Sequence, residues 1–205
     1  MHYLNNAFVQ FFEYLHRGVV SVFPNQNVSY GLAIILMTVI IRVIILPLGI
    51  KQIKSSLIMN KIQPEVKKIQ DKYKKDPQKA QQEMMKLYKE KGASPFSGCL
   101  PLLIQWPILV ALYYVFNNLT GINGISFLWI TNLDKSDIPL SILSGITTFL
   151  SGWLIMPSGD NPQASQSKKM NIGMVFMMVF ISWSLNSALV LYWFFSNLIQ
   201  IAQNF

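Results

Sequence analysis

Long apolar blocks alternate with short polar segments along this chain of 205 residues. The block at 29–50 contains a run of 21 residues, Tyr30 to Ile50, that carries a single charge, Arg42. As a helix this run extends about 31 Å, which matches the hydrocarbon thickness of a bilayer. Four further blocks have the same apolar character, at 96–118, 139–156, 170–185 and 186–205, the last opening with a turn. The pattern predicts an all-α integral membrane protein with five transmembrane helices.

Residues 1–28 differ from these blocks because they are amphipathic. Phe8 and Phe12 belong to an apolar stripe with helical spacing, whereas Glu13 and Arg17 occupy other faces. We expect an interfacial helix, too polar to span, lying flat on the outer membrane surface. The alternative, a helix of a soluble core, has no soluble core after it in the sequence. This segment also lacks the basic start and continuous apolar run of a cleavable signal peptide.

The segment 51–95 carries most of the positive charge, since it holds twelve of the 17 Lys and Arg residues. Its apolar residues are scattered and do not form a long run. It is typical of a helical hairpin, whose first helix we expect to be interrupted near Pro64. Asp76 and Pro77 form a start signal for the second helix, and Gly92 a stop signal. Narrow apolar stripes should pack the two helices together, at Val66, Ile69 and Tyr73 on one side and at Ala80, Met84, Leu87 and Tyr88 on the other.

The distribution of charge predicts one orientation for the whole chain. Under the positive-inside rule the 51–95 hairpin is cytoplasmic, as is the loop at 157–169. The loop at 119–138 is then external, and the outer segments hold only Arg17 and Lys135 as basic residues. We therefore expect a multi-pass protein of the cell membrane, with its N-terminus outside and its C-terminus in the cytoplasm. The fourth and fifth spans, separated by little more than Asn186, should form a tight hairpin.

Arg42 is the main candidate functional residue, because a charge inside a span is costly. It lies about 13 Å from the cytoplasmic end of its block, and no span carries an Asp or Glu to pair with it. The alternative is an arginine that snorkels to the headgroups, which this depth makes difficult. We expect a water-filled cavity beside the first span, with Thr38, one turn away, on the same face.

A second polar feature lies in the last block, where polar side chains recur on one helical face. The second span holds one strongly polar side chain, Gln105. Ordinary interhelical hydrogen bonds, worth about 0.6 kcal/mol each, are the alternative explanation for both features. The residues of the stripe are Asn186, Trp193, Asn197, Gln200 and Asn204.

Composition removes several classes of function. The chain is 52% hydrophobic and only 13% charged, against about 25% charged for soluble domains. Its net charge of +8 is concentrated in one loop, so direct reading of nucleic acid is not indicated. With Cys99 as the single cysteine there is no intramolecular disulfide, and we read it as a small apolar residue. No metal-binding, phosphate-binding or catalytic motif is present, so neither an enzyme nor a cofactor is expected.

Five blocks in order resemble the YidC family of membrane protein insertases, which is related to the mitochondrial and thylakoid insertases of the Oxa type. The most specific is SGCLPLLIQWPILVALY at 97–113, and GLAIILMTVIIRVIILPL at 31–48 is similar to the family's first span. The other blocks are PEVKKIQDKYKKDPQKAQQEMMKLYKEKG at 64–92, FLWITNLDKSD at 127–137 and LVLYWFFSNLIQIAQ at 189–203.

This resemblance implies an insertase and chaperone that inserts and helps fold nascent membrane proteins. It implies five transmembrane helices around a hydrophilic groove, open to cytosol and lipid, with Arg42 as the groove cation and Trp193 in contact with substrate. To these we add Thr38, Gln105 and Asn197 from helical geometry. The implied partners are nascent membrane proteins and the lipid bilayer, with the Sec translocon and the ribosome as further partners of a monomer.

The chain departs from the family pattern in three places. Asn186-Ser187-Ala188 stands where many members have Pro-Ala-Gly or Pro-Ser-Gly. The sequence ends at Phe205 without the basic tail that the family links to ribosome contact, so we do not expect tail-mediated contact, and we expect a short form without a large periplasmic domain. A small solute or ion transporter is the main alternative, although no internal repeat supports it. A purely structural membrane subunit, the other alternative, explains Arg42 poorly.

Overall fold

The computed structural model of the protein describes residues 2–92, 100–119, 121–156 and 162–204. Over these residues the chain is all-α, as predicted, with one isolated β-bridge between Phe127 and Ile130. Helices α4, α5 and α7 begin and end near the predicted limits, whereas α6 begins eight residues before its predicted start at 170. The helices are α1 (His2–Val22), α2 (Gln26–Lys72), α3 (Pro77–Glu90), α4 (Leu100–Asn118), α5 (Ile138–Ile155), α6 (Pro162–Ser182) and α7 (Ser187–Gln203).

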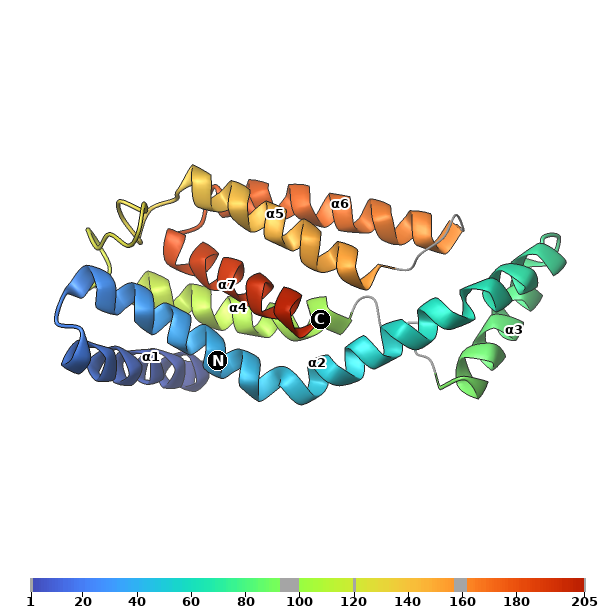
Figure 1. Ribbon diagram of the computed structural model, residues 1–205, viewed down its shortest axis with the longest axis horizontal. Helices are drawn as coiled ribbons and strands as arrows, with labels where there is room; N and C mark the ends of the chain where they lie inside the picture. Colours follow the sequence, from blue (N-terminus) through green and yellow to red (C-terminus); the bar gives the residue numbers. More distant parts are fainter. Residues whose placement is uncertain (1, 93–99, 120, 157–161, 205) are drawn as a thin grey trace.

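Helix α2 is continuous for 47 residues, and it passes through both Pro47 and Pro64 (Figure 1). The predicted interruption near Pro64 is therefore wrong. A proline inside a helix removes one backbone hydrogen bond and crowds the preceding turn. Here Ile62 and Val66, on either side of Pro64, are buried in an apolar cluster with α3. That packing stabilises the helix where the proline weakens it.

Helix α3 folds back along the last turns of α2 and completes the predicted hairpin (Figure 1). Asp76 caps its N-terminus by accepting a hydrogen bond from the Lys79 backbone N–H at 3.0 Å, and Gly92 follows its end with φ +64°. The predicted stripes meet, since Val66 is buried with Leu87 and Tyr88. The hairpin is thus a small unit with its own core and exposed lysines.

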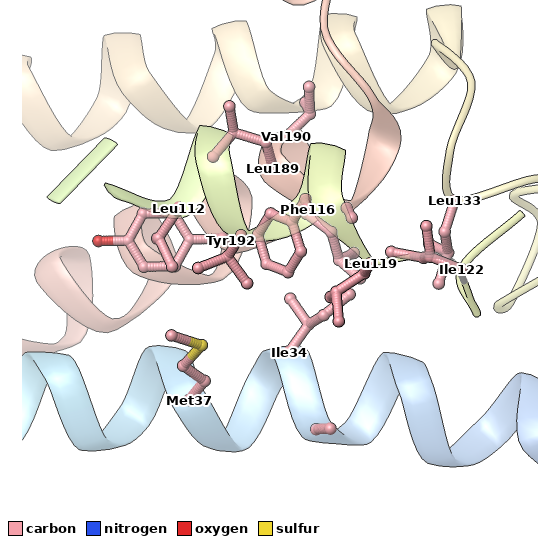
Figure 2. Close-up of a cluster of buried hydrophobic side chains, with 14 of the residues drawn as sticks. Ile34, Met37, Leu112, Phe116, Leu119, Ile122, Leu133, Leu189, Val190 and Tyr192 are labelled. Carbon is pink, nitrogen blue, oxygen red and sulfur yellow. The ribbon is translucent and has the colours of Figure 1, made fainter. Parts of the chain in front are cut away.

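The main core lies between α2, α4 and α7. Figure 2 shows Ile34 and Met37 of α2 facing Leu112 and Phe116 of α4, with Tyr192 of α7 between them. All five side chains are almost completely buried. The Tyr192 hydroxyl points away from the loop that joins α4 to α5. This core fixes α7 against the first part of α2.

Helix α5 packs against both α7 and α6. The connection from α6 to α7 is short, as predicted, but the two helices do not pack together as a hairpin over the described residues. Close approach explains the preference of α6 for α5. A Cβ at Gly145 would overlap Val179, and one at Gly152 would overlap Asn171. Glycines on α5 therefore admit α6 side chains, and α6 lies on the far side of α5 (Figure 1).

Helix α1 packs on α2 and α4, so its apolar face is covered by protein. Phe12 is fully buried and meets Phe116 edge to face, with 5.7 Å between ring centroids. His16 Nε2 lies 3.1 Å from Ser29 Oγ, and its ring packs on Tyr30. The apolar face of α1 therefore packs on the bundle, and the place of α1 on the outer membrane surface stays a prediction.

The loop between α4 and α5 is fastened to the first turn of α7. The backbone N–H groups of Ser187 and Ala188 donate to the carbonyls of Lys135 and Leu133, at 2.8 and 3.0 Å. Asn186 supplies the N-cap by accepting from the Leu189 N–H at 3.2 Å. These bonds satisfy N–H groups that a helix start leaves without partners. The loop thereby closes one end of the bundle.

Candidate functional site

Arg42 lies in the middle of the apolar part of α2, and its side chain is turned towards α7. Its Nε donates to Ser196 Oγ at 2.7 Å, and an Nη donates to Gln200 Oε1 at 3.2 Å. The residue is only 9% exposed. None of the ion pairs among the described residues involves Arg42. The buried cation is held by two neutral oxygen acceptors.

A second polar contact extends this site to α4. Gln105 Nε2 donates to the Tyr192 hydroxyl at 3.1 Å, and Tyr192 precedes Ser196 by one turn of α7. Polar side chains of α4, α7 and α2 therefore follow one another from Gln105 to Arg42. The prediction named Gln105 and Arg42, and the structure places Tyr192 and Ser196 between them. We refer to Arg42, Gln105, Tyr192, Ser196 and Gln200 as the arginine cluster.

The guanidinium group retains capacity for a ligand. It carries five N–H donors in a planar fork and keeps its charge. Two of these donors have acceptors among the described residues, so three remain. A carboxylate accepts such donors in pairs, with short, charge-assisted hydrogen bonds. The arrangement is therefore suited to an acidic group that approaches inside the membrane.

Sequence reasoning overlooked Ser196 and Tyr192, although the signal was available. Tyr192, Ser196 and Gln200 are spaced four residues apart, so they follow one face of α7. Trp193 and Asn197 are each one position further on, which turns them about 100° around the helix. The predicted polar stripe therefore divides, and the two sets of side chains face different helices.

Trp193 and Asn197 face α5, away from Arg42. The Trp193 indole N–H donates to Thr148 Oγ1 at 3.0 Å, and Asn197 Nδ2 donates to the same oxygen at 2.8 Å. Asn197 also reaches Thr147 Oγ1 at 3.4 Å. Their shared acceptor lies on α5, and a role for Trp193 and Asn197 in the groove stays a prediction. They form a separate contact, the threonine cluster, made of Thr147, Thr148, Trp193 and Asn197.

Thr38 lies one turn before Arg42 but has no bond to it. Its side chain is fully buried, and its hydroxyl donates to the Ile34 carbonyl at 2.7 Å. The hydroxyl is therefore satisfied within α2. A role for Thr38 in lining a groove remains a prediction.

The described part of the chain contains no candidate metal site. No group of three or more His, Cys, Asp or Glu side chains there is placed to hold a metal ion. Cys99 lies outside the described residues, so its interpretation as a small apolar residue is not tested.

Comparison with protein families gives a match over residues 22–205 to the model described as 60Kd inner membrane protein. Two similar curated relatives are both described as membrane protein insertase YidC. The one from Clostridium tetani is 56% identical over 203 residues, which cover 99% of this chain and 92% of the relative. The one from Clostridium acetobutylicum is 54% identical over 98% of this chain and 82% of the relative.

A more distant relative and a solved structure agree with these matches. The membrane protein insertase MisCA of Bacillus subtilis is 41% identical over 86% of this chain and 69% of the relative. A crystal structure described as an active YidC insertase superposes with a TM-score of 0.72 at 34% identity, covering 97% of this chain. The superposition spans 44% of that longer chain.

Proposed function

The chain belongs to the YidC family of membrane protein insertases, and from this premise we propose that it inserts nascent membrane proteins through a hydrophilic groove built around Arg42. The observation that carries the proposal is a buried arginine inside an apolar helix, whose acceptors in the described part of the chain are neutral and leave three N–H donors without a partner there. We take Arg42, Thr38, Gln105, Trp193 and Asn197 as groove residues and add Ser196 and Gln200.

The mechanism follows from the cost of carrying a polar tail across lipid. A short acidic external tail of the substrate binds the guanidinium, whose charge and hydration lower that cost. The apolar segment of the substrate then leaves sideways into lipid beside α2 and α7. A negative tail that moves outward also gains up to about 2.3 kcal/mol per charge for each 100 mV of membrane potential. No nucleotide is required.

The distribution of polarity supports placing the bundle in a bilayer. Helix α2 is long and apolar enough to cross a membrane, and Ile138–Leu154 is apolar but shorter. On α5, apolar side chains such as Ile142 and Ile146 are exposed, whereas Ser144 and Thr148 are buried. This reverses the usual pattern of a soluble protein. We propose five spans, with the N-terminus outside and the C-terminus in the cytoplasm.

Cysteine labelling tests this topology in a Cys99→Ser background. The external probe is Ser136→Cys in the loop between α4 and α5, and the probe for the hairpin is Gln82→Cys. Both positions are exposed. In intact cells an impermeant thiol reagent should label position 136 and leave position 82 unlabelled until the cells are opened. Labelling of position 82 in intact cells would contradict the orientation and the mechanism with it.

The α2–α3 hairpin has no role in a transporter but fits an insertase. Its exposed lysines are suited to anionic lipid, to substrate or to the translocation machinery. We propose that the protein acts as a monomer, with the Sec translocon and the ribosome as partners for some substrates. The family match does not favour the alternative of a small solute or ion transporter.

Reconstitution tests the function directly. The purified protein in liposomes, without any partner, should insert a short single-span substrate, because the groove and the lipid exit lie within one chain. The measurement is protease protection of the translocated tail, with protein-free liposomes as the control. Insertion no greater than in that control would sink the proposal that this chain is sufficient.

A further inference from the structure

A strained turn holds two apolar side chains outward at the tip of the loop between α4 and α5. Leu128 has a φ of +54°, the only positive φ of a non-glycine residue in the described part of the chain. Leu128 is 67% exposed and its neighbour Trp129 is 45% exposed. Left-handed backbone is unfavourable for leucine and free of cost for glycine. The side chain that causes the strain makes little contact with the protein.

The turn itself is firmly built. Phe127 and Ile130 exchange two backbone hydrogen bonds, each 2.9 Å long, so Leu128 and Trp129 form a two-residue loop. In such loops a positive φ at the first position is normally taken by glycine. The flanking Phe127 and Ile130 are buried. Rigid flanks and exposed tip residues indicate that the tip is held for a contact outside the chain.

The contacts between this turn and α2 determine how deep the turn lies in the membrane. Phe127 packs so closely on Gly31 that a Cβ there would overlap its ring, and the Ser126 N–H donates to Asn27 Oδ1 at 3.0 Å. Gly31 precedes Lys51 by 20 residues, or about 30 Å of helix, which equals the hydrocarbon thickness. With Lys51 at the cytoplasmic boundary, the turn lies at the outer one.

We propose that Leu128 and Trp129 form an anchor that inserts into the outer interface of the bilayer. The inference rests on the orientation given under the proposed function. Tryptophan and leucine suit this layer, and the charged residues of the loop, Asp134, Lys135 and Asp137, lie away from the tip in sequence. Apolar side chains are also exposed in two other segments, Phe23 at the α1–α2 turn and Ile138 at the start of α5. Figure 1 shows the α1–α2 turn and the start of α5 at the same end of the bundle as the α4–α5 loop. The anchor holds the loop that caps α7.

Depth-dependent quenching tests the anchor in proteoliposomes. An environment-sensitive fluorophore is attached to Leu128→Cys or, as a matched control in the same loop, to Ser136→Cys, both with Cys99→Ser. At position 128, lipids with a shallow nitroxide should quench at least about threefold more than at 136, and aqueous iodide at least about threefold less. Equal access of iodide to both positions would overturn the proposal. Blue-shifted emission at 128 without quenching by lipid would indicate a protein partner and would also overturn it.

The thermal stability of Leu128 variants in detergent distinguishes backbone strain at this position from packing of its side chain. Leu128→Gly and Leu128→Asn relieve the strained backbone, whereas Leu128→Ala removes the side chain but keeps the strain. The Tm of the Gly and Asn variants should equal or exceed that of the unmodified protein by up to about 3 °C, and should exceed that of the Ala variant. A fall of more than about 5 °C in both would mean that Leu128 packs within the protein, and the anchor would be wrong. Quenching does not require insertase activity, so an inactive protein with a lipid-quenched tip would contradict only the proposed function.

Discussion

Replacing Arg42 by alanine should lower the insertion of acid-tailed substrates about tenfold, while substrates with neutral tails lose less than about threefold. A hydrogen bond to a charged group contributes about 1.5–3 kcal/mol, and 1.4 kcal/mol corresponds to a factor of ten. A neutral tail does not make that contact, so it loses only the hydration that the cation supports. The measurement is the insertion rate in liposomes for one substrate carrying either Asp or Asn in its tail.

The level of folded protein should survive this change. Arg42→Ala removes the cost of burying a cation. Arg42→Lys is the matched control, since it keeps the charge but offers a compact ammonium in place of the fork. It should retain much of the insertion of acidic tails. If Arg42→Ala inserted both tails as well as the unmodified protein, the electrostatic role would be wrong.

The sequence predicted the α2–α3 hairpin well because its signals are local. The start signal of α3, Asp76-Pro77, and its stop signal, Gly92, lie next to the helix ends that they determine. Both ends of α3 are where they were expected. The prediction at Pro64 failed because the tendency of proline to break a helix is outweighed by the burial of Ile62 and Val66 against α3. These contacts join residues that are distant in the sequence, so a local pattern does not reveal them.

The candidate site was predicted in part for a related reason. A single charge in an apolar run can be recognised without a structure, so Arg42 was selected as a candidate from the sequence alone. Ser196 was missed because serine is common in membrane helices and becomes meaningful only when α7 is seen against α2. Trp193 and Asn197 were selected from the sequence as polar residues of the last span. Their partner is Thr148 on α5, and helical periodicity within α7 does not reveal which neighbour each face meets.

The threonine cluster depends on a single hydroxyl with its full set of hydrogen bonds. Thr148 Oγ1 donates to the Ser144 carbonyl at 2.7 Å and accepts from both Trp193 and Asn197. A hydroxyl has one donor and two acceptor sites, so every site is used. Trp193 and Asn197 are 7% and 6% exposed, so neither readily finds water instead. This geometry makes Thr148 the residue that positions both side chains.

Thr148→Val should therefore destabilise the protein by about 1–3 kcal/mol, since it conserves shape but leaves the buried Trp193 N–H without its acceptor and Asn197 with only its 3.4 Å contact to Thr147. Thr148→Ser keeps the hydroxyl and should restore most of the stability and insertion activity. Thr147→Val is the control on the same helix, because it removes only the 3.4 Å contact with Asn197 and should cost less. Thermal unfolding in detergent measures all three variants.

A double-mutant cycle with Trp193→Phe identifies the bond responsible. Phenylalanine has no N–H, so in that background Thr148→Val loses one of its two effects. The two changes together should be less harmful than the sum of the separate changes, by about 0.5–1.5 kcal/mol. The same non-additivity should appear in insertion rates if Trp193 acts in the groove only when α5 orients it. Strict additivity in both measurements, or a Thr148→Ser variant as impaired as Thr148→Val, would show that Thr148 does not position Trp193.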